Sequence, residues 1–528
     1  MRRLTGIVMV AMLLGGCGGG GGGGATGGSF SPPPSTSTWQ AGVFKPASDF
    51  AAQCAVPRSG IDPGTGRAYP DRAGSTLAEN NWLRSWTNDL YLWFGEVTDQ
   101  DPALFSTTAS YFKVLKTKAV TSTGAAKDKF HFTYLTSDWQ ALAGSGIQAG
   151  YGIQWVLISA TPPRRVVVAY TEPGSPATAP GVNIPRGAEV LKVDGVDVVN
   201  DNTQTGVNTL NAGLFPSAAN ESHTLQILDQ PSSSPRTVTL TSASITSQPV
   251  QHVQTVPFAG GLAGYMLFND QLATSEAALV AAFTTLQAAH VTELVLDLRY
   301  NGGGYLDIAS EVAYMIAGPT ATAGFTFDLT QFNSKHPSTD PVTGQPITPT
   351  PFHSTTQGFS TTSGQALPAL NLARVVVITG PDTCSASEAI MNGLRGANVQ
   401  VIQIGSTTCG KPYGFYPQDN CGTTYFSIQF QGVNAAGFGD YPDGFSPQNS
   451  TSPTNATLPG CSVADDFTKE LGDATEGRFS AALGYLVTPG ACPAPSGQAA
   501  LAPRELRASA MDGRLPASPL RNLRLLSH

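Results

Sequence analysis

The amino-acid sequence predicts an α/β protein built from several domains. Its 528 residues are enough for two to four domains of ordinary size. From about residue 250 onward, short apolar runs typical of buried strands alternate with longer runs of helical periodicity, which favours an open sheet with helices packed on it. Between 148 and 245, several β-like runs are separated by turn residues, which is typical of a small β-rich domain.

Composition and charge exclude several classes of protein. Charged residues make up 12% and hydrophobic residues 41% of the chain, and the net charge is -8. These values exclude an acidic disordered chain, a coiled coil and a nucleic-acid binder with a basic face, and they give no electrostatic reason to expect an anionic bilayer as partner. No apolar run of 18 residues follows residue 16, so no membrane-spanning helix is expected.

The first 16 residues have the features of a secretory signal peptide. Arg2 and Arg3 precede the apolar run 4–14, and the segment leads into Leu-Gly-Gly-Cys17, which resembles a bacterial lipobox. The resemblance implies that Cys17 is lipidated and that the protein is anchored in the cell envelope, at the outer membrane facing the periplasm; an ordinary cleaved signal is the alternative. Residues 17–75, rich in Gly, Pro and Ser, are expected to form a flexible tether.

The cysteines suit an oxidising compartment. Of the seven, six remain once Cys17 is set aside, and an even number favours disulfides in an exported protein. Cys409 and Cys421 flank a predicted hairpin, and Cys461 and Cys492 flank a helical segment, so these two pairings are expected; buried free thiols are the alternative. No CxxC pair and no Cys/His cluster with metal-ligand spacing occurs, so no metal site is expected.

Local patterns set the remaining boundaries. Residues 76–145 are expected to form a helical subdomain, because Trp82, Trp86, Leu90 and Trp93 follow helical spacing. The other expected units are the β-rich domain 146–247, the α/β domain 248–490 and a disordered tail, 491–528. Within the α/β domain, strands are expected at 262–269, 293–299, 373–379 and 399–404, and helices at 275–289, 305–317, 385–394 and 466–487. The polar insert 318–370 is long for a loop, so it is expected to be functional or mobile.

Three segments of the α/β domain carry residues suited to catalysis. The segment 297–304 ends a strand in three glycines, whose backbone N–H groups can approach a reacting oxygen closely. The segment 383–388 places Ser385 at a helix start, where the N–H of the next residue and the positive helix end favour a developing oxyanion. The segment 408–414 contains Lys411, which can act as a base for a serine hydroxyl if burial keeps its amine neutral.

In order and spacing these segments closely resemble the C-terminal processing peptidases, which are tail-specific serine proteases. The motifs that carry the resemblance are Asp297-Leu298-Arg299-Tyr300-Asn301-Gly302-Gly303-Gly304, Ser385-Ala386-Ser387-Glu388 and Gly405 to Lys411. The resemblance implies a crotonase-like α/β peptidase core in which Ser385 is the nucleophile, Lys411 the general base and Glu388 a supporting acid. It also implies an oxyanion hole formed by the N–H groups of Gly303 and Ala386. The sequence departs from the family pattern at Gly302 and Pro412, and it places Cys384 and Cys409 beside the site.

The β-rich domain resembles a bacterial PDZ domain. Gly150-Tyr151-Gly152-Ile153 opens its first strand, like the glycine-rich loop that takes a peptide C-terminus together with an exposed strand edge. A helix at 203–214 would form the other wall of the groove. A β-rich spacer without a ligand is the alternative.

These resemblances imply an exported serine endopeptidase that cleaves protein or peptide substrates near their C-termini through an acyl-enzyme at Ser385. No cofactor and no nucleic-acid partner is implied, and contact with the membrane is through the lipid anchor only. Two alternatives remain open. The chain could be a non-catalytic peptide-binding scaffold with the same fold, or an enzyme whose base is His252 or another upstream histidine.

Overall fold

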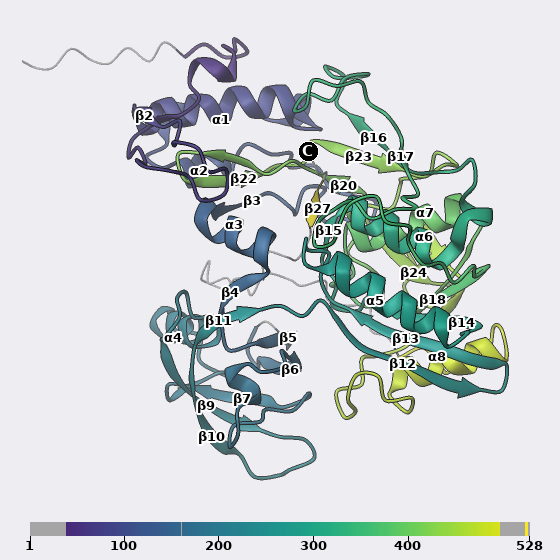
Figure 1. Ribbon diagram of the computed structural model, residues 1–528. Coiled ribbons are helices and arrows are strands. Elements are labelled where there is room, and N and C mark those ends of the chain that lie inside the picture. The colour runs from purple at the N-terminus through teal and green to yellow at the C-terminus, as the bar shows by residue number, and fades with distance from the viewer. Residues whose placement is uncertain (1–38, 160, 497–522, 526–528) are drawn as a thin grey trace, which may run out of the picture. The chain divides into compact units, whose positions relative to one another are not determined.

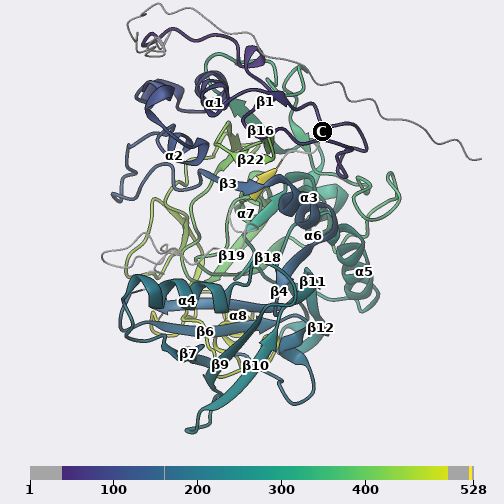
Figure 2. The same ribbon diagram turned by 90° about the vertical axis from the view of Figure 1, so that its left-hand side faces the viewer.

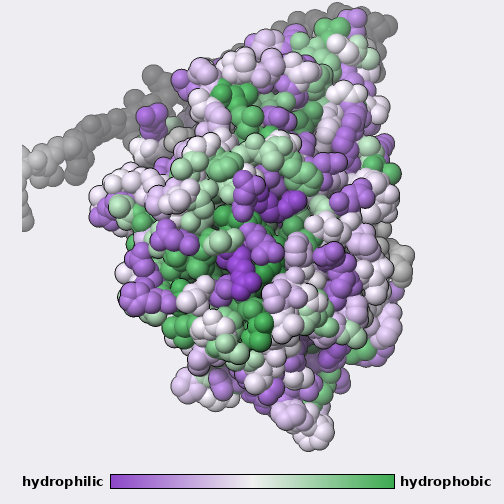
Figure 3. All heavy atoms as spheres, turned by 90° about the vertical axis from the view of Figure 1, so that its right-hand side faces the viewer, coloured by the Kyte–Doolittle hydropathy of each residue, from purple (hydrophilic) through white to green (hydrophobic). Residues whose placement is uncertain are grey.

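The structure is a computed structural model that describes residues 39–159, 161–496 and 523–525. The signal segment and Cys17 lie outside the described residues, so nothing in the structure bears on lipidation. Among the described residues, no helix combines the length and the apolar character that a bilayer crossing requires. Polar and apolar side chains are interspersed on the face seen in Figure 3.

The largest sheet of the α/β region has six strands. Their order is β12 (Val250–Phe258), β13 (Gly261–Phe268), β14 (Glu293–Asp297), β18 (Arg374–Thr379), β19 (Gln400–Gly405) and β26 (Gly460–Ser462). Only β12 runs antiparallel to its neighbour; the other pairs are parallel. Parallel strands need crossover connections, which explains the alternation of strand and helix patterns in the sequence.

Helices cover both faces of this sheet (Figure 1). Alternate strand residues such as Leu296 and Val377 pack in one core with α5 (Ser275–Ala288), α6 (Leu306–Thr322) and α7 (Ala386–Gly396). Their neighbours, such as Val295 and Val376, pack in a second core with α8 (Gly477–Val487). The strands are therefore buried on both faces, which is why their sequences are continuously apolar. Helix α6 is kinked at Gly318, before Pro319.

The β-rich region forms its own sheet. Its order is β10 (Arg236–Thr241), β9 (Ser222–Leu228), β7 (Glu189–Val193), β6 (Arg165–Thr171) and β5 (Ile153–Ser159), with β8 (Val196–Asp197) on β7. Helix α4 (Gln204–Leu214) accompanies this sheet (Figure 2) and is capped by the Thr203 hydroxyl, which accepts from the N–H of Gly206 at 3.0 Å. Strand β5 ends the order, so one of its edges is unpaired by the strands described.

The aromatic N-terminal region is only partly helical. Helix α1 (Thr76–Leu90) buries Trp82 and Trp86, whose rings stack with centroids 5.2 Å apart. Trp93 lies beyond this helix, so the expectation that it continues the helical spacing of Trp82, Trp86 and Leu90 is wrong. Helix α2 (Thr108–Phe112), strand β3 (Phe132–Leu135) and helix α3 (Thr136–Ser145) follow. Strand β3 pairs with β22 (Thr423–Phe426), which in turn pairs with β21 (Gln418–Asn420), so this region shares a sheet with a distant segment.

Part of the predicted tether is structured. Within 39–75 the structure has β1 (Gln53–Cys54) paired with β2 (Arg72–Ala73), and a disulfide joins Cys54 to Cys421. Gly, Pro and Ser in this stretch therefore mark turns in a segment that is covalently fixed, and the expectation of a flexible tether as far as residue 75 is wrong. Composition alone does not distinguish a loop that a disulfide holds from a linker.

The polar insert is held in place by a buried carboxylate. Glu276 on α5 accepts hydrogen bonds from the backbone N–H groups of Gln357, Gly358, Ser360 and Thr361, at 2.7–3.1 Å. The insert also contributes β16 (Thr326–Phe332) and β17 (Thr350–Pro351), and β16 continues through β23 (Phe430–Val433) to β20 (Tyr413–Gly414). The insert is therefore an integral part of the fold.

The remaining elements are short. They are the pairs β4 (Ile147–Gly150) with β11 (Ala243–Thr246), β24 (Phe445–Pro447) with β25 (Ala456–Leu458) and β15 (Gly303–Tyr305) with β27 (Leu523–Leu525), and the 3-10 turns Ala47–Asp49, Phe94–Glu96, Pro102–Leu104 and Pro176–Thr178. The closing helix begins at Gly477 instead of 466. In the predicted tail, Cys492 is bonded to Cys461 and residues Leu523–Leu525 form a strand, so these parts are ordered.

A buried charge cluster fixes the loop after β14. The guanidinium of Arg299 donates to the carboxylates of Asp297, Asp465 and Glu476 at 2.7–2.9 Å. The side chains of Arg299, Asp297 and Glu476 are wholly buried. Burial raises the pKa of Glu476, but the charge of Arg299 and the hydrogen bonds from Arg299 and from the N–H of Phe479 together lower it more, so the pKa lies below its usual value.

Replacing Arg299 should destabilise the protein strongly. Arg299→Met leaves buried carboxylates without their cation, so the free energy of unfolding should fall by about 3–5 kcal/mol. Urea denaturation would measure this. The matched control is Arg374→Met, which breaks a partly exposed pair with Glu293 and should cost about 1 kcal/mol or less. Equal losses in the two variants would contradict the assignment.

A second buried carboxyl group connects the β-rich region to the loop after β13. Glu172 accepts hydrogen bonds from the N–H of Gln248 at 3.1 Å and the hydroxyl of Ser247 at 3.5 Å, and that hydroxyl lies 3.2 Å from Asp270. Burial raises the pKa of Glu172 from 4.5 to about 7. The folded state therefore retains a proton here over a pH range in which the unfolded chain has released it.

This retained proton makes stability depend on pH. As the pH rises from 4.5 to about 7, the unfolded state binds fewer protons at Glu172 than the folded state, so the free energy of unfolding should fall across that window. Glu172→Gln does not titrate and should lose this part of the decline, at most about 3 kcal/mol at about 1.4 kcal/mol per pKa unit. Melting temperatures of both proteins between pH 4.5 and 7.5 would test it; parallel profiles would show that Glu172 does not contribute.

Candidate active site

Three loops converge at one edge of the main sheet. Strands β14, β18 and β19 are adjacent and parallel, so the segments after Asp297, Thr379 and Gly405 leave the sheet at the same edge. Ligand sites of open α/β sheets lie at such carboxyl ends. The three segments that the sequence singles out are thus brought together by the strand order.

Backbone hydrogen bonds hold the three loops against one another. The N–H of Cys384 donates to the carbonyl of Asn301 at 3.1 Å, and the N–H of Cys409 donates to the carbonyl of Thr383 at 3.0 Å. The Thr383 hydroxyl reaches back to the carbonyl of Leu298 at 2.8 Å. The middle loop is therefore fixed from both sides.

Ser385 occupies a strained position at the start of α7. Its φ of 60° and ψ of -113° are rare for a residue with a Cβ, and such conformations persist where the surroundings enforce them. The side chain is buried, and its Oγ has no hydrogen-bond partner in the part of the chain that the structure describes. Ala386 follows as the first helical residue, where N–H groups have no intrahelical acceptor.

The carboxylate of Glu388 links the loop that carries Ser385 to the segment that carries Lys411. Oε2 accepts from the backbone N–H of Ser385 at 2.9 Å and from that of Lys411 at 2.8 Å. Oε1 accepts from the N–H of Gly410 at 2.9 Å and the hydroxyl of Thr408 at 2.5 Å. Burial raises the pKa of Glu388, although these hydrogen bonds act in the opposite direction. Glu388 thus fixes two backbone positions at once.

Lys411 is wholly buried among aromatic rings. Its Nζ lies 4.1 Å from the ring centroid of Phe415 and 5.1 Å from that of Phe130. A second amine is close: Lys129 donates from Nζ to the carbonyl of Cys409 at 2.8 Å, and burial lowers its pKa. The sequence gives no sign of Lys129, because it belongs to a segment about 280 residues earlier in the chain.

The expected base and its alternative occupy different surroundings. The backbone N–H groups of Ser385 and Lys411 both donate to the Glu388 carboxylate. Their side chains are not hydrogen-bonded to each other, since Ser385 Oγ has no partner among the described residues. His252 lies on β12, which pairs with β13 at the end of the sheet order. Burial lowers the pKa of His252, and the acidic groups that oppose this are Glu470 and Asp297. It makes no hydrogen bond to Ser385 Oγ either.

The glycine loop is arranged differently from the sequence-based expectation. The N–H of Gly303, expected to point into an oxyanion hole, donates instead to Asn301 Oδ1 at 2.9 Å. Gly304 has φ +146°, and a Cβ there would lie 2.0 Å from the carbonyl oxygen of Gln271. The N–H of Gln271 donates to the carbonyl of Gly303 at 3.1 Å, and the carbonyl of Gln271 accepts from the N–H of Tyr305 at 3.0 Å. An oxyanion role for Gly303 requires the Asn301 contact to open.

The chain supplies an extended segment beside this loop. Strand β15 pairs in parallel with β27, with Gly303 opposite Leu523 and Tyr305 opposite Leu525. Figure 1 shows β27, in gold, next to β15 and close to β20. One edge of β15 is therefore paired with an extended segment of the same chain.

The disulfides correct one predicted pairing. Cys461 and Cys492 are bonded, as the sequence predicts, but Cys409 is bonded to Cys384 and Cys421 to Cys54. Cys409 and Cys421 are near in sequence, whereas the carboxyl ends of adjacent strands bring Cys409 to Cys384. The sulfurs of Cys384 and Cys409 lie near the Glu388 carboxylate, and because they are bonded to each other they are not available as thiolate ligands for a metal.

The residues proposed from the PDZ resemblance lie where β4 meets β5. Gly150 ends β4, Tyr151 is buried, and Ile153 begins β5. The carbonyl of Gly152 accepts from the N–H of Glu172 at 2.7 Å, and the Trp155 ring N–H donates to the carbonyl of Leu214 at the end of α4, at 3.1 Å. The unpaired edge of β5 begins at this loop.

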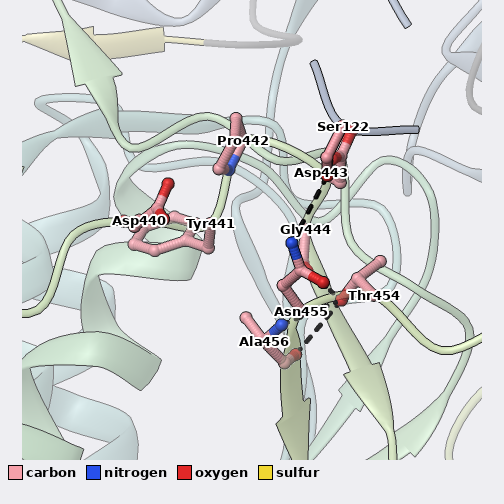
Figure 4. A pocket seen from close by; sticks show the side chains of 9 residues that line it. All are labelled: Ser122, Asp440, Tyr441, Pro442, Asp443, Gly444, Thr454, Asn455 and Ala456. Carbon is pink, nitrogen blue, oxygen red and sulfur yellow. Dashed lines mark hydrogen bonds between the residues drawn. The ribbon is translucent and has the colours of Figure 1, made fainter. Parts of the chain in front are cut away.

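A small pocket of about 160 Å³ is lined by Ser122, by residues 440–444 and by residues 454–456 (Figure 4). Gly444 in its lining contacts the Lys411 segment closely, since a Cβ on it would lie 2.1 Å from the carbonyl of Thr408. Asp443 accepts hydrogen bonds from the hydroxyls of Thr121, Ser122 and Thr123 at 2.6–3.1 Å. Despite burial, the hydrogen bonds from these hydroxyls lower the pKa of Asp443 and make it a weak base, so the three loops are the stronger candidate.

Comparison with known proteins agrees with this location. Residues 263–415 match the model of peptidase family S41. The carboxyl-terminal-processing protease of Picosynechococcus sp. strain PCC 7002 is 26% identical over 274 residues, which are 51% of this chain and 55% of that protein. The chain thus matches about half the length of this curated relative.

Solved structures extend the similarity to the fold. A crystal structure from Bacteroides fragilis assigned to the S41 proteases has a TM-score of 0.56 at 22% identity, over 79% of this chain and 98% of that one. A photosystem II D1 C-terminal processing protease has a TM-score of 0.41 at 20% identity, over 73% and 94%. The range 263–415, which matches the model of peptidase family S41, includes Ser385, Glu388 and Lys411.

Proposed function

We propose that this protein is a serine endopeptidase in which Ser385 is the nucleophile and Lys411 the general base. The observation that carries the proposal is the buried carboxylate of Glu388, which binds the backbone N–H of both residues within 3 Å. This common anchor fixes the backbone of a serine in a strained turn relative to the backbone of a lysine among aromatic rings. Burial disfavours the charged form of an amine, which suits a proton acceptor.

The proposed reaction proceeds through an acyl-enzyme. The Lys411 amine takes the proton of the Ser385 hydroxyl as Oγ attacks the peptide carbonyl carbon, and the resulting oxyanion is stabilised by the N–H of Ala386 at the positive end of α7. The peptide C–N bond then breaks, and Lys411 returns the proton to the leaving amine. Water hydrolyses the ester and frees Ser385.

Peptides would reach the site as extended strands. The pairing of β15 with β27 supports this, because it shows an extended segment running beside the nucleophile loop. We further propose that the groove between the β5 edge and α4 binds the substrate C-terminus, as in PDZ domains, with Gly150 to Ile153 receiving the carboxylate.

We propose that the protein works outside the cytoplasm, as a lipoprotein anchored through Cys17 and facing the periplasm. The signal-like segment 1–16 and the lipobox resemblance carry this proposal. The three disulfides support it, because such bonds persist in oxidising compartments.

Removal of either reacting group should abolish peptide cleavage without unfolding the protein. Ser385→Ala and Lys411→Ala should each lower kcat/KM at least about 1000-fold, since each deletes a group needed for bond formation. Cleavage of an unstructured protein substrate, followed by mass spectrometry, measures this. Exposed Ser232→Ala and Lys469→Ala are the matched controls and should retain activity.

Labelling separates the competing assignments. A fluorophosphonate should acylate Ser385 in the wild type but not in Ser385→Ala. Absence of labelling in the folded wild type would favour the non-catalytic scaffold. Activity that survives Lys411→Ala would assign the base elsewhere, and His252→Ala would then test the alternative.

Recognition of a free C-terminus should depend on its charge. Peptides with a free carboxylate should bind and be cleaved at least about tenfold more efficiently than the same peptides with a C-terminal amide, because the amide lacks the charge that backbone N–H groups of a PDZ-type loop favour. Fluorescence anisotropy with Ser385→Ala measures binding without turnover. Equal affinity for both forms would contradict C-terminal recognition.

A further inference from the structure

The Cys384–Cys409 disulfide joins the two loops that carry the proposed reacting groups. Cys384 directly precedes Ser385, and Cys409 stands two residues before Lys411. Their Cα atoms are 5.1 Å apart, and the two residues are 0% and 6% exposed. The bond therefore lies within the wall of the candidate site.

This disulfide and Glu388 hold the same pair of loops by different means. The Glu388 carboxylate accepts hydrogen bonds from the N–H groups of Ser385, Gly410 and Lys411, and the sulfur of Cys409 lies 3.5 Å from this carboxylate. The disulfide adds a covalent limit on how far the loops can separate. The positive φ of Ser385 needs such enforcement, because the conformation is unfavourable for a residue with a side chain.

The other two disulfides lie elsewhere in the fold. Cys54–Cys421 fixes the N-terminal segment to the turn between β21 and β22, and Cys461–Cys492 connects β26 to the segment after α8. Neither flanks Ser385 or Lys411 in sequence. The protein therefore has one disulfide at the candidate site and two elsewhere, and the latter two can serve as controls.

We propose that the Cys384–Cys409 disulfide is a redox-sensitive positioning element that sets Ser385 against Lys411, so that the oxidised protein turns over substrate and the reduced protein does so poorly. This inference rests on the proposed peptidase function. Reduction lets the sulfurs move apart to non-bonded contact and leaves two thiols beside the buried Glu388 carboxylate. The strained turn then loses its covalent constraint and keeps only its hydrogen bonds.

The redox step needs a dithiol reductant. A thiolate of the dithiol attacks Sγ of Cys409, the more exposed of the two, and the Cys384 sulfur leaves as a thiolate that takes up a proton. The second thiolate of the dithiol then attacks the dithiol's own sulfur in the mixed disulfide, and the Cys409 sulfur leaves as a thiolate that takes up a proton. The protein gains two electrons and two protons, and the dithiol becomes a disulfide. Burial makes the step slow, so the oxidised form is expected to persist until a strong reductant is present.

The test compares matched pairs of cysteines in the full chain. Cys384→Ala/Cys409→Ala should lower kcat for peptide cleavage at least tenfold, with KM changed less than threefold. The fluorophosphonate labelling rate of Ser385 should fall in parallel. Cys54→Ala/Cys421→Ala and Cys461→Ala/Cys492→Ala are the controls, and should lower the melting temperature while keeping kcat within twofold. All assays are run at least 15 degrees below the melting temperature of the variant.

Reversible reduction provides a second measurement that does not require the variant to fold. Wild-type protein is treated with dithiothreitol, the state of each cysteine pair is read by alkylation and mass spectrometry, and the protein is reoxidised with oxidised glutathione. Activity should fall as the Cys384–Cys409 pair opens, with near-UV circular dichroism unchanged, and should return on reoxidation.

Each outcome has a defined meaning. Retention of kcat within twofold in Cys384→Ala/Cys409→Ala overturns the inference, as does an activity loss that only follows loss of the circular dichroism signal. If oxidised wild type neither cleaves peptides nor reacts with the fluorophosphonate, the proposed function itself fails. A reduced protein that stays folded and labels slowly supports the positioning role.

Discussion

The candidate site depends on one buried carboxylate. Glu388 lies on the first turn of α7, yet three of its four donors lie in a segment 20–23 residues later in the chain. A charge so deeply buried is costly unless several donors surround it, and here three backbone N–H groups and one hydroxyl do so. Helix start, strained turn and strand end therefore have to be placed correctly together, because the carboxylate requires all of its donors.

The sheet makes this arrangement possible. The three loops follow adjacent parallel strands and therefore lie at the same edge of the sheet. Hydrogen bonds of Asn301 and Thr383 and the Cys384–Cys409 disulfide connect these loops to one another. The aromatic residues around Lys411 are Phe415, four residues later in the same stretch of chain, and Phe130 of the N-terminal region. The main sheet thus fixes the loop ends, while the N-terminal region completes the surroundings of the amine.

What the sequence predicts and what it misses follow from the range of the interactions. Local periodicity predicts four strands of the main sheet, β13, β14, β18 and β19, and helices α5 and α7 closely, because each is buried on a regular pattern. The edge strands β12 and β26 are not predicted. The Cys54–Cys421 bond and the contact of Lys129 with Cys409 join segments hundreds of residues apart, and no local pattern records them. The hydrogen bond from the N–H of Gly303 to Asn301 is also missed. A run of glycines shows that backbone N–H groups can approach another atom closely, but it does not show which acceptor they bind.

The pairing of β27 with β15 has a consequence for how the site would meet other peptides. A segment of the same polypeptide competes at an effective concentration that is commonly on the order of millimolar, whatever the amount of protein present. An incoming chain has to displace this resident strand. Weak, transient encounters would therefore go unprocessed, and only ligands held by a second contact elsewhere on the molecule would stay long enough to exchange.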